Sequence, residues 1–127
     1  MTTQLTSEVV IIDSITEVRP EHAGRIVVTG SHGGASAGHY ALAVRAKLYV
    51  FNDAGIGKDN AGIAALGLLD RAGIAAVAVA HTSARIGDAN DTLWNGTVSR
   101  MNTAANGLDL AMGASLRESV ATLAELA

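Results

Sequence analysis

The chain contains no cysteine, one proline and very few aromatic residues. The absence of cysteine excludes a disulfide framework and a cysteine nucleophile, and it leaves a cytoplasmic location as the expectation. Aromatic residues make up 3% of the chain although hydrophobic residues make up 49%, so the core must consist of aliphatic side chains and alanine. At 127 residues, the chain is long enough to form one folded domain over residues 1–127.

The sequence also lacks the features that are typical of nucleic-acid-binding proteins, of membrane proteins and of signal peptides. Basic residues are not in excess, since the net charge is -3 and the pI is near 5.7, and nucleic acid is therefore not expected as a partner. No apolar run approaches the roughly 20 residues that a membrane-spanning helix needs. The N-terminal residues carry no basic stretch of the kind that begins a signal peptide. We therefore expect no membrane association.

What the sequence does contain is a repeated order of apolar strand, small polar turn and helix. Apolar runs at residues 9–12, 25–30, 48–51 and 74–80 predict strands, with residues 13–18 continuing the first or forming a short second one. The last three runs are continuous rather than alternating, which is typical of strands buried on both faces of a parallel sheet. Helical spacing predicts helices at residues 35–46 and 61–72. The pattern predicts an α/β fold, namely a single three-layer, Rossmann-like domain with a mainly parallel sheet and helices on both faces.

The last third of the chain is less regular. Residues 84–96 show no periodicity, and we predict an irregular loop that covers the ligand site. Thr97 is predicted to cap a helix that runs to about residue 106. The final helix is the best marked, because Ser115 and Glu118 form a capping-box pattern and apolar residues follow at helical spacing.

Three turns of the predicted fold lie beyond the carboxyl ends of strands, where open parallel sheets bind their ligands. Charged residues are only 17% of the chain, yet several gather in these turns. We predict that the turns form one site for a small anionic molecule. The residues concerned are Ser31, His32, Gly33 and Gly34 after the second strand, Asn52, Asp53, Gly55, Gly57, Lys58 and Asp59 after the third, and His81, Ser83 and Arg85 after the fourth.

Asp53, His32 and His81 are the candidate catalytic residues of this site. A carboxylate and imidazoles at strand ends can accept and return protons near neutral pH. Each has a structural alternative, because an aspartate in a turn often binds its own backbone N–H groups and a lone histidine is often part of the packing. His32 and His81 can lie side by side only if their strands are neighbours in the sheet.

The other predicted residues bind rather than react. Glycines at positions 55 and 57 allow the backbone to approach a ligand closely, and Lys58 adds a positive charge suited to a carboxylate or phosphate. The spacing does not match a Walker A loop. Arg85 can bind a carboxylate through two N–H groups, or it can pair with an aspartate in the following loop. Asp59 can equally serve as the cap of the next helix.

Two other chemistries fit the sequence less well. Histidine and aspartate are suitable metal ligands, but their spacing matches no metal motif, and we expect no metal site. A serine nucleophile at Ser31 or Ser83 lacks the Gly-x-Ser-x-Gly turn that usually presents one. The sequence identifies no cofactor.

Three segments together resemble a group of bacterial conserved hypothetical proteins. They read GSHGG at residues 30–34, NDAGIGKDxAGI at 52–63 and HxSARIGD at 81–88. The resemblance spans about residues 25–125 and supports the choice of the three turns, but it implies no established activity. The function stays open between an enzyme that performs hydrolysis or proton transfer on a small anionic metabolite, a non-catalytic metabolite-binding or sensor domain, and a structural subunit. The small size and low aromatic content also predict a homo-oligomer.

Overall fold

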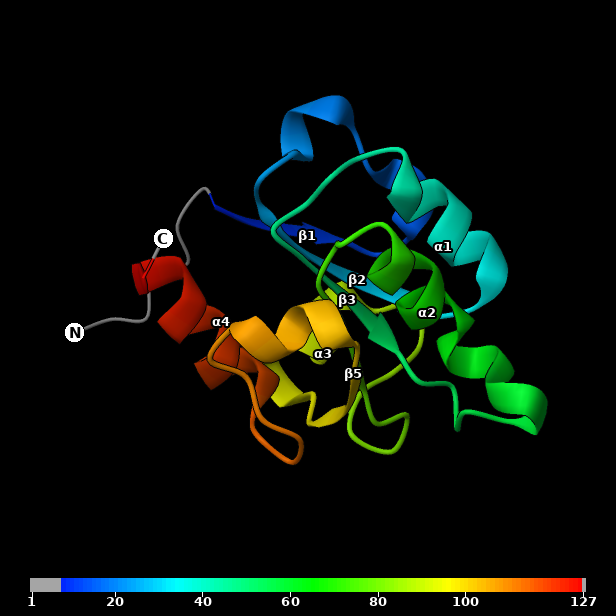
Figure 1. The fold of residues 1–127 in the computed structure, drawn as a ribbon. Helices are drawn as coiled ribbons and strands as arrows, with labels where there is room; N and C mark the ends of the chain where they lie inside the picture. The colour runs from blue at the N-terminus through cyan, green and yellow to red at the C-terminus, as the bar shows by residue number, and fades with distance from the viewer. Residues whose placement is uncertain (1–7, 127) are drawn as a thin grey trace.

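The computed structural model describes residues 8–126 and contains a five-stranded sheet with helices on both faces (Figure 1). The strands lie side by side in the order of the sequence. The first four are parallel, and the fifth runs antiparallel to the fourth. The predicted α/β class and the mainly parallel, three-layer arrangement are confirmed. The strands are β1 (Val9–Ile12), β2 (Ile26–His32), β3 (Leu48–Asn52), β4 (Ala76–Val79) and β5 (Val98–Met101).

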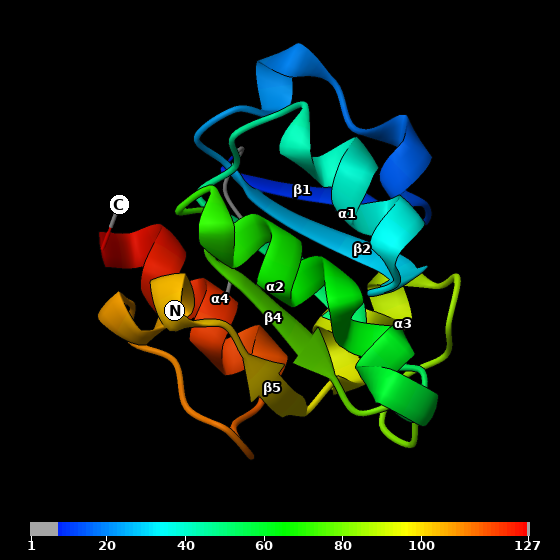
Figure 2. The same cartoon turned by 45° about the vertical axis from the view of Figure 1, so that its right-hand side comes forward.

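Helical segments connect the strands and complete the outer layers (Figure 2). Among residues 8–126, no helix has the length and apolar composition needed to span a membrane. The α-helices are α1 (Ala35–Leu42), α2 (Ala64–Arg71), α3 (Ala89–Asn95) and α4 (Leu116–Leu126), and the 3₁₀ segments are η1 (Ile15–Glu17), η2 (Pro20–His22), η3 (Lys58–Ile63) and η4 (Thr103–Gly107).

One face of the sheet is covered by the segments that connect the parallel strands. Tyr49 and Ala78 point to this face and pack in one cluster with Ile15 of η1, Ala41 of α1 and Leu69 of α2. Tyr49 is fully buried, and its hydroxyl donates to the Val44 carbonyl at 2.6 Å. Burial raises the pKa of Tyr49 to about 12, which keeps the phenol neutral within the core.

The opposite face is covered by the C-terminal part of the chain. Val50 and Val79 point to this face, since side chains alternate along a strand, and they pack with Leu93 of α3 and with Leu116 and Val120 of α4. The two outer layers are therefore separated in sequence. The connections between the parallel strands β1 to β4 form one layer, and helices α3 and α4, which follow β4 in the sequence, form the other (Figures 1 and 2).

The strand order has a direct consequence for the site. Doubly wound sheets bind ligands in the crevice where the strand order reverses. Here the order never reverses, so no such crevice exists between the described strands. Because β3 lies between β2 and β4, the end of β3 separates His32, the last residue of β2, from His81 in the turn after β4.

Two predictions for the C-terminal third are wrong. Residues 84–96 include α3, which begins where the Asp88 side chain accepts from the Asp91 backbone N–H. The predicted helix over residues 97–106 is instead β5 followed by η4. Asn102 is buried and bonds to Ala76, Leu66 and Ile74, so tertiary hydrogen bonds at the free edge of β4 decide the structure over local helical spacing.

The remaining elements agree with the sequence more closely. Residues 13–18 do not extend the first strand, because Ser14 and Glu17 form a capping box around η1. β1 is a parallel edge strand. At the start of α4, the Glu118 N–H donates to the Ser115 hydroxyl oxygen, as the capping pattern predicts.

Candidate functional site

Asp53 stands directly after β3 and is the most enclosed charged residue of the predicted site, with 5% of its surface exposed. Its Oδ1 accepts from the backbone N–H groups of Gly55, at 2.8 Å, and His81, at 3.0 Å. Its Oδ2 accepts from the Ser99 hydroxyl at 2.7 Å. The carboxylate thus joins three segments, namely its own turn, the turn after β4 and strand β5.

These contacts keep the carboxylate ionised. Burial alone would raise the pKa of Asp53, but hydrogen bonds from the Ser99 hydroxyl and from two backbone N–H groups outweigh that effect. The pKa is therefore held below its ordinary value of 3.8. A charged group that receives several hydrogen bonds is stabilised in its charged form.

His81 lies beside this carboxylate at the surface. Its Nδ1 is 3.4 Å from Asp53 Oδ1, and its side chain is 52% exposed. The ring also lies against Gly55, since a Cβ placed there would be 3.6 Å from the His81 Cε1. A carboxylate next to Nδ1 favours the proton on that nitrogen and leaves Nε2 as an acceptor. The structure therefore places Asp53 and His81, two of the three candidate catalytic residues, next to each other.

The turn after Asp53 has an unusual backbone. Gly55 and Gly57 have positive φ, and so do the non-glycine residues Ala54, Ile56, Asp59 and Asn60, with φ between 51° and 66°. Within residues 8–126 these four are the only non-glycine residues with positive φ. For an L-residue the left-handed conformation costs about 1–2 kcal/mol, and a β-branched side chain such as that of Ile56 adopts it rarely. Such strain is concentrated at functional sites more often than elsewhere.

Gly62 fixes the shape of this turn from the inside. Its N–H donates to the Ile56 carbonyl at 2.7 Å, and the Ile56 N–H donates to the Asp53 carbonyl at 2.6 Å. A Cβ at position 62 would collide with the Asp53 carbonyl oxygen. The turn therefore closes back on the end of β3, and a glycine at position 62 is a steric requirement.

Lys58 and Asp59 lie at the exposed end of the same turn, at the start of η3. No hydrogen bond or ion pair joins either side chain to another residue in the described part of the chain. Asp59 does not cap a helix, because its backbone is left-handed within η3. Both charges are thus available to a ligand.

The end of β2 and the turn after it form a separate group on the other side of β3, and Ser31 and His32, expected after the strand, are the last two residues of β2. His32 is exposed, and its Nδ1 accepts from the Gly34 N–H at 3.2 Å. Ser31 supports η1, since its hydroxyl oxygen accepts from the Ile15 N–H at 2.9 Å. Gly33 bonds to the Asn52 carbonyl through its N–H and to Ala65 through its carbonyl. No hydrogen bond or ion pair links His32 to Asp53 among the described residues, so the predicted site divides into two groups.

Asn52 is a structural residue at the end of β3. It is fully buried, its amide donates to the Ala84 carbonyl at 3.0 Å, and its Oδ1 accepts from the Ala54 N–H at 2.8 Å. Both polar atoms are therefore used within the protein, and Asn52 holds the start of the strained turn against the segment after β4.

Ser83 and Arg85 follow β4 and have different surroundings. The Ser83 hydroxyl donates to the Ala80 carbonyl at 2.6 Å and accepts from the Thr97 N–H at 3.0 Å, so it is not free to act as a nucleophile. The Arg85 N–H donates to the Asp91 carboxylate at 2.8 Å. The pKa of Asp91 is lowered by the hydrogen bonds from Asn95 and Arg85 and by the positive charge of Arg85. The bond to Asp91 comes from the Arg85 backbone, and within the described residues no ion pair within 4.0 Å joins the Arg85 guanidinium to an acidic side chain. The expected salt bridge within the loop is therefore not formed.

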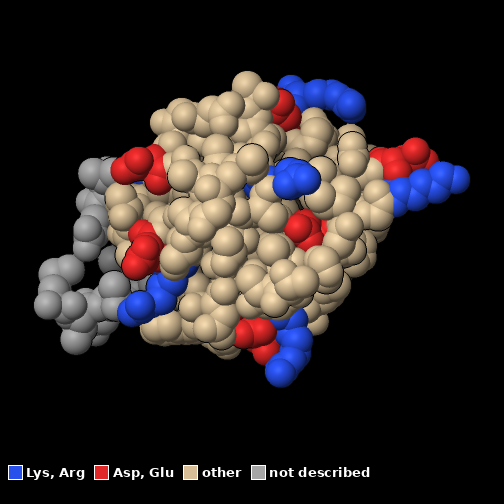
Figure 3. Space-filling model, turned by 90° about the horizontal axis from the view of Figure 1, so that it is seen from below, with Lys and Arg blue, Asp and Glu red and all other residues tan. Residues whose placement is uncertain are grey.

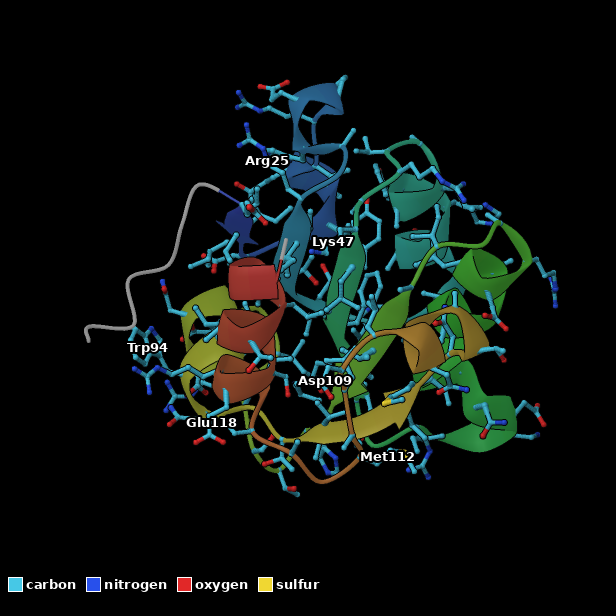
Figure 4. All side chains as sticks on the ribbon, turned by 60° about the vertical axis from the view of Figure 1, so that its left-hand side comes forward. Arg25, Lys47, Trp94, Asp109, Met112 and Glu118 are labelled. Carbon is cyan, nitrogen blue, oxygen red and sulfur yellow. The ribbon has the colours of Figure 1, made fainter. Side chains whose placement is uncertain are left out.

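Sequence reasoning missed Ser99 because it assigned the residues after 96 to a helix. The hydroxyl of Ser99 reaches both Asp53 Oδ2 and, at 3.3 Å, the Ala78 carbonyl. A prediction of a strand at residues 98–101, paired with β4, would have placed Ser99 next to the end of β4. Trp94 of α3 is 50% exposed, and the guanidinium of Arg117 from α4 lies over its ring, 4.4 Å from the ring centroid (Figure 4).

The surface charge is mixed on the face of the molecule seen from below (Figure 3). Figure 3 shows acidic and basic side chains in small separate groups on uncharged surface, without a broad field of either sign. Within residues 8–126, no three histidine, aspartate or glutamate side chains are placed so that they could hold a metal ion. The chemistry available at the carboxyl ends is therefore that of a fixed carboxylate, an exposed imidazole and nearby backbone N–H groups.

Comparisons with protein-family models, with curated proteins and with solved structures found no match to this chain.

Proposed function

We propose that the protein is an enzyme that binds a small anionic metabolite and transfers a proton with His81 as the general base. The observation that carries the proposal is the buried, ionised Asp53 carboxylate 3.4 Å from the half-exposed imidazole of His81. A fixed carboxylate orients an imidazole and stabilises the imidazolium that forms when the ring accepts a proton. Nε2 would then take a proton from the metabolite or from a water molecule.

Two features of the turn after β3 support a ligand at this place. The left-handed residues between 54 and 60 retain a conformational cost that a purely structural turn could avoid with glycine. Lys58 is exposed and without an acidic partner among the described residues, and its ammonium suits a carboxylate or phosphate. Proton transfer is favoured over hydrolysis by a serine, because the Ser83 hydroxyl is already donated to Ala80.

The alternative is a domain that binds the metabolite without changing it. Every hydrogen bond to Asp53 also holds the fold together, since it connects β3, β5 and the turn after β4. An aspartate with a structural task would have the same contacts. Only a measurement of turnover separates the two functions.

The test begins with a thermal-shift screen of small carboxylates and phosphates against the whole chain. Each compound that stabilises the protein is then incubated with it in D₂O, and loss of its acidic C–H signals is followed by proton NMR. We expect exchange of a C–H proton for deuterium with the wild-type protein and at least a hundredfold slower exchange, on the order of the loss of a general base, with His81→Gln. Stabilisation of both proteins without exchange would instead identify a binding domain.

His22→Gln is a matched control for this test. His22 lies in η2, in the turn before β2 at the opposite ends of the strands, so it should leave both binding and exchange unchanged. If His22→Gln lowers the exchange rate as much as His81→Gln does, the assignment of the base is wrong.

We also propose that the chain forms a homodimer through the free edge of β1. The Glu8 carbonyl accepts from Ile26, and alternate residues of a parallel strand face the same neighbour, so Val9 and Ile11 direct their N–H and C=O groups outward. No described strand pairs with that edge, and β1 contains only valine and isoleucine. Unprotected edges of this kind pair with other strands.

Light scattering on a sizing column tests the dimer. Val9→Pro removes an outward N–H and should leave the bonds to β2 intact, so it should yield a folded monomer, whereas Val9→Thr should stay dimeric. A monomeric wild-type protein would overturn this proposal.

A further inference from the structure

A groove on the face covered by α2 is separate from the Asp53–His81 pair. It has a volume of about 390 Å³, and it lies between η3 and α2 on one side and β5 and η4 on the other. Ligand pockets of roughly 300–1,000 Å³ are typical of small-molecule sites. The sequence prediction placed Asp59 among ligand-binding residues but did not identify the opposite wall of this groove.

The groove is lined by charges of both signs. Arg100 contributes the positive charge from β5, and Asp59 and Asp70 contribute negative charges from η3 and α2. Among the described residues, no ion pair within 4.0 Å joins Arg100 to either aspartate. Opposite charges that line one groove without meeting leave space for a ligand that carries the complementary charge at each end.

The three charged side chains of the groove differ in how many of their hydrogen-bonding groups are already used within the protein. Arg100 donates one N–H, from Nη1 to the Ser99 carbonyl at 2.7 Å, and a guanidinium has five. Asp70 uses one oxygen to accept from the Ala104 N–H at 2.8 Å. Asp59 receives no hydrogen bond from the described residues. The guanidinium of Arg100 and the carboxylate of Asp59 are therefore the groups with most unused capacity.

The rest of the lining is largely apolar. Ile63 and Leu66 contribute from the helical wall and Met101 from β5. Methionine adapts its shape to different apolar groups. A ligand that fits this wall has an apolar portion as well as its two charges.

The left-handed residues extend to this groove. Asp59 and Asn60 both line it, with φ of 56° and 59°. Aspartate and asparagine tolerate this conformation better than other non-glycine residues, although at some cost. The wall that bears the negative charge is therefore fixed in an uncommon backbone conformation, and strain of this kind is often found at ligand sites.

We propose that this groove binds a free α-amino acid with an apolar side chain. The α-carboxylate binds the guanidinium of Arg100, which matches a carboxylate with two parallel N–H groups. The α-ammonium binds the carboxylate of Asp59, and the apolar side chain packs against Ile63, Leu66 and Met101. The proposal does not depend on proton transfer at His81.

Calorimetric titration of the whole chain with L-leucine tests the proposal, with two truncated probes. 4-Methylpentanoate lacks the ammonium and 3-methylbutylamine lacks the carboxylate. We expect leucine to bind, and each truncated probe to bind at least about tenfold more weakly, which corresponds to about 1.4 kcal/mol. Absence of leucine binding at about 10 mM, well above a 1 mM Kd, would overturn the proposal.

Two variants show whether each charge has its assigned partner. Arg100→Gln should weaken leucine and 4-methylpentanoate about tenfold and leave the amine unchanged, because only the first two carry a carboxylate. Asp59→Asn should weaken leucine and the amine and leave 4-methylpentanoate unchanged. Equal loss of all three probes in both variants would overturn the charge assignment.

Controls keep the result separate from the proposed function and from changes in fold. Arg71→Gln and Asp109→Asn change exposed charges that do not line the groove, so leucine should bind both like the wild-type protein. His81→Gln should also bind leucine normally. Loss of leucine binding in His81→Gln would show that the two sites are one, which contradicts this inference but not the proposed function.

Discussion

Gly33 and Gly34 follow β2, and Gly55 and Gly57 follow β3, yet only the second pair has positive φ. A Cβ at Gly33 would lie 2.9 Å from the Gly62 carbonyl oxygen, and one at Gly34 would lie 2.8 Å from the His32 ring. A Cβ at Gly57 would meet nothing within 4 Å. The first turn therefore needs residues without a side chain, and the second needs residues that can adopt a positive φ.

This difference separates packing from conformational strain. The first turn has the glycines that its close contacts require. The second turn also places alanine, isoleucine, aspartate and asparagine where glycine would be less costly. Both turns are rich in glycine, but only the turn after β3 holds non-glycine residues in a backbone conformation that raises their energy.

Gly62→Ala gives the largest expected effect, because it disrupts the backbone contact that closes the turn after β3 onto the end of that strand. The new Cβ collides with the Asp53 carbonyl oxygen, which is backbone and cannot rotate away. We expect a loss of about 4 kcal/mol or more in the free energy of unfolding, measured by urea denaturation. A loss below about 1 kcal/mol would show that the turn after β3 is more adaptable than its contacts indicate.

Gly33→Ala and Gly57→Ala compare the two turns directly. Gly33→Ala forces a shift of Gly62, whose carbonyl oxygen would lie 2.9 Å from the new Cβ, and should cost about 2–3 kcal/mol. Gly57→Ala meets no atom, but it should still cost about 1–3 kcal/mol, because a φ of 71° with a ψ of -171° is a backbone conformation that residues other than glycine scarcely adopt. The same denaturation series measures both variants. A loss below about 0.5 kcal/mol in either one would contradict the packing requirement at Gly33 or the conformational requirement at Gly57.

Acid titration examines the carboxylate at which the second turn begins. The folded pKa of Asp53 is lowered, so its contribution to stability is fully present above its unfolded pKa of about 4 and is lost as pH falls through the lower folded value. Asp53→Asn should cost about 2 kcal/mol at pH 7 and should flatten the loss of stability below pH 4. His32→Asn is the control and should lose stability at low pH as the wild-type protein does. If Asp53→Asn also loses stability at low pH as steeply as the wild-type protein, other carboxylates determine the acid sensitivity.

Ile56→Gly gives the smallest effect and the opposite sign. Glycine adopts positive φ without steric cost, so relief of the left-handed isoleucine should stabilise the protein by about 1 kcal/mol. Ala37→Gly, in the helix after the first turn, should destabilise by about 1 kcal/mol. Thermal denaturation followed by circular dichroism compares them. If Ile56→Gly is destabilising, packing of the isoleucine outweighs the strain.

The sequence was sufficient to predict the parallel part of the sheet. The continuous apolar runs became β2, β3 and β4, and the capping pattern at Ser115 became the start of α4. These signals are local, because burial on both faces and a side-chain cap each leave a pattern within a few residues.

The parts that failed depend on distant contacts. Residues 98–101 pair with the edge of β4, and Asn102 bonds to residues 26 to 36 positions away. The spacing of apolar residues within a short segment does not reveal such distant partners. The same failure concealed Ser99, whose link to Asp53 spans 46 positions. Arg100 was overlooked for the same reason.

The sequence indicated which residues lie at the carboxyl ends of the strands but not how they are grouped. Asp53 and His81 do meet, because β3 and β4 are neighbours. His32 lies apart because β3 intervenes, and strand order cannot be read from turns alone. The left-handed conformation of Ile56 could not be predicted either, since a β-branched residue is among the least expected there.

The separation of the two outer layers along the sequence has a consequence for synthesis on the ribosome. Once β4 has been made, η1, α1 and α2 can already cover their face of the sheet. The other face, with Ile26, Val28, Leu48, Val50 and Val77, has no cover until α3 and α4 follow. A nascent chain that ends before residue 116 therefore exposes a continuous aliphatic surface, the kind of surface that chaperones bind and that aggregates when they do not.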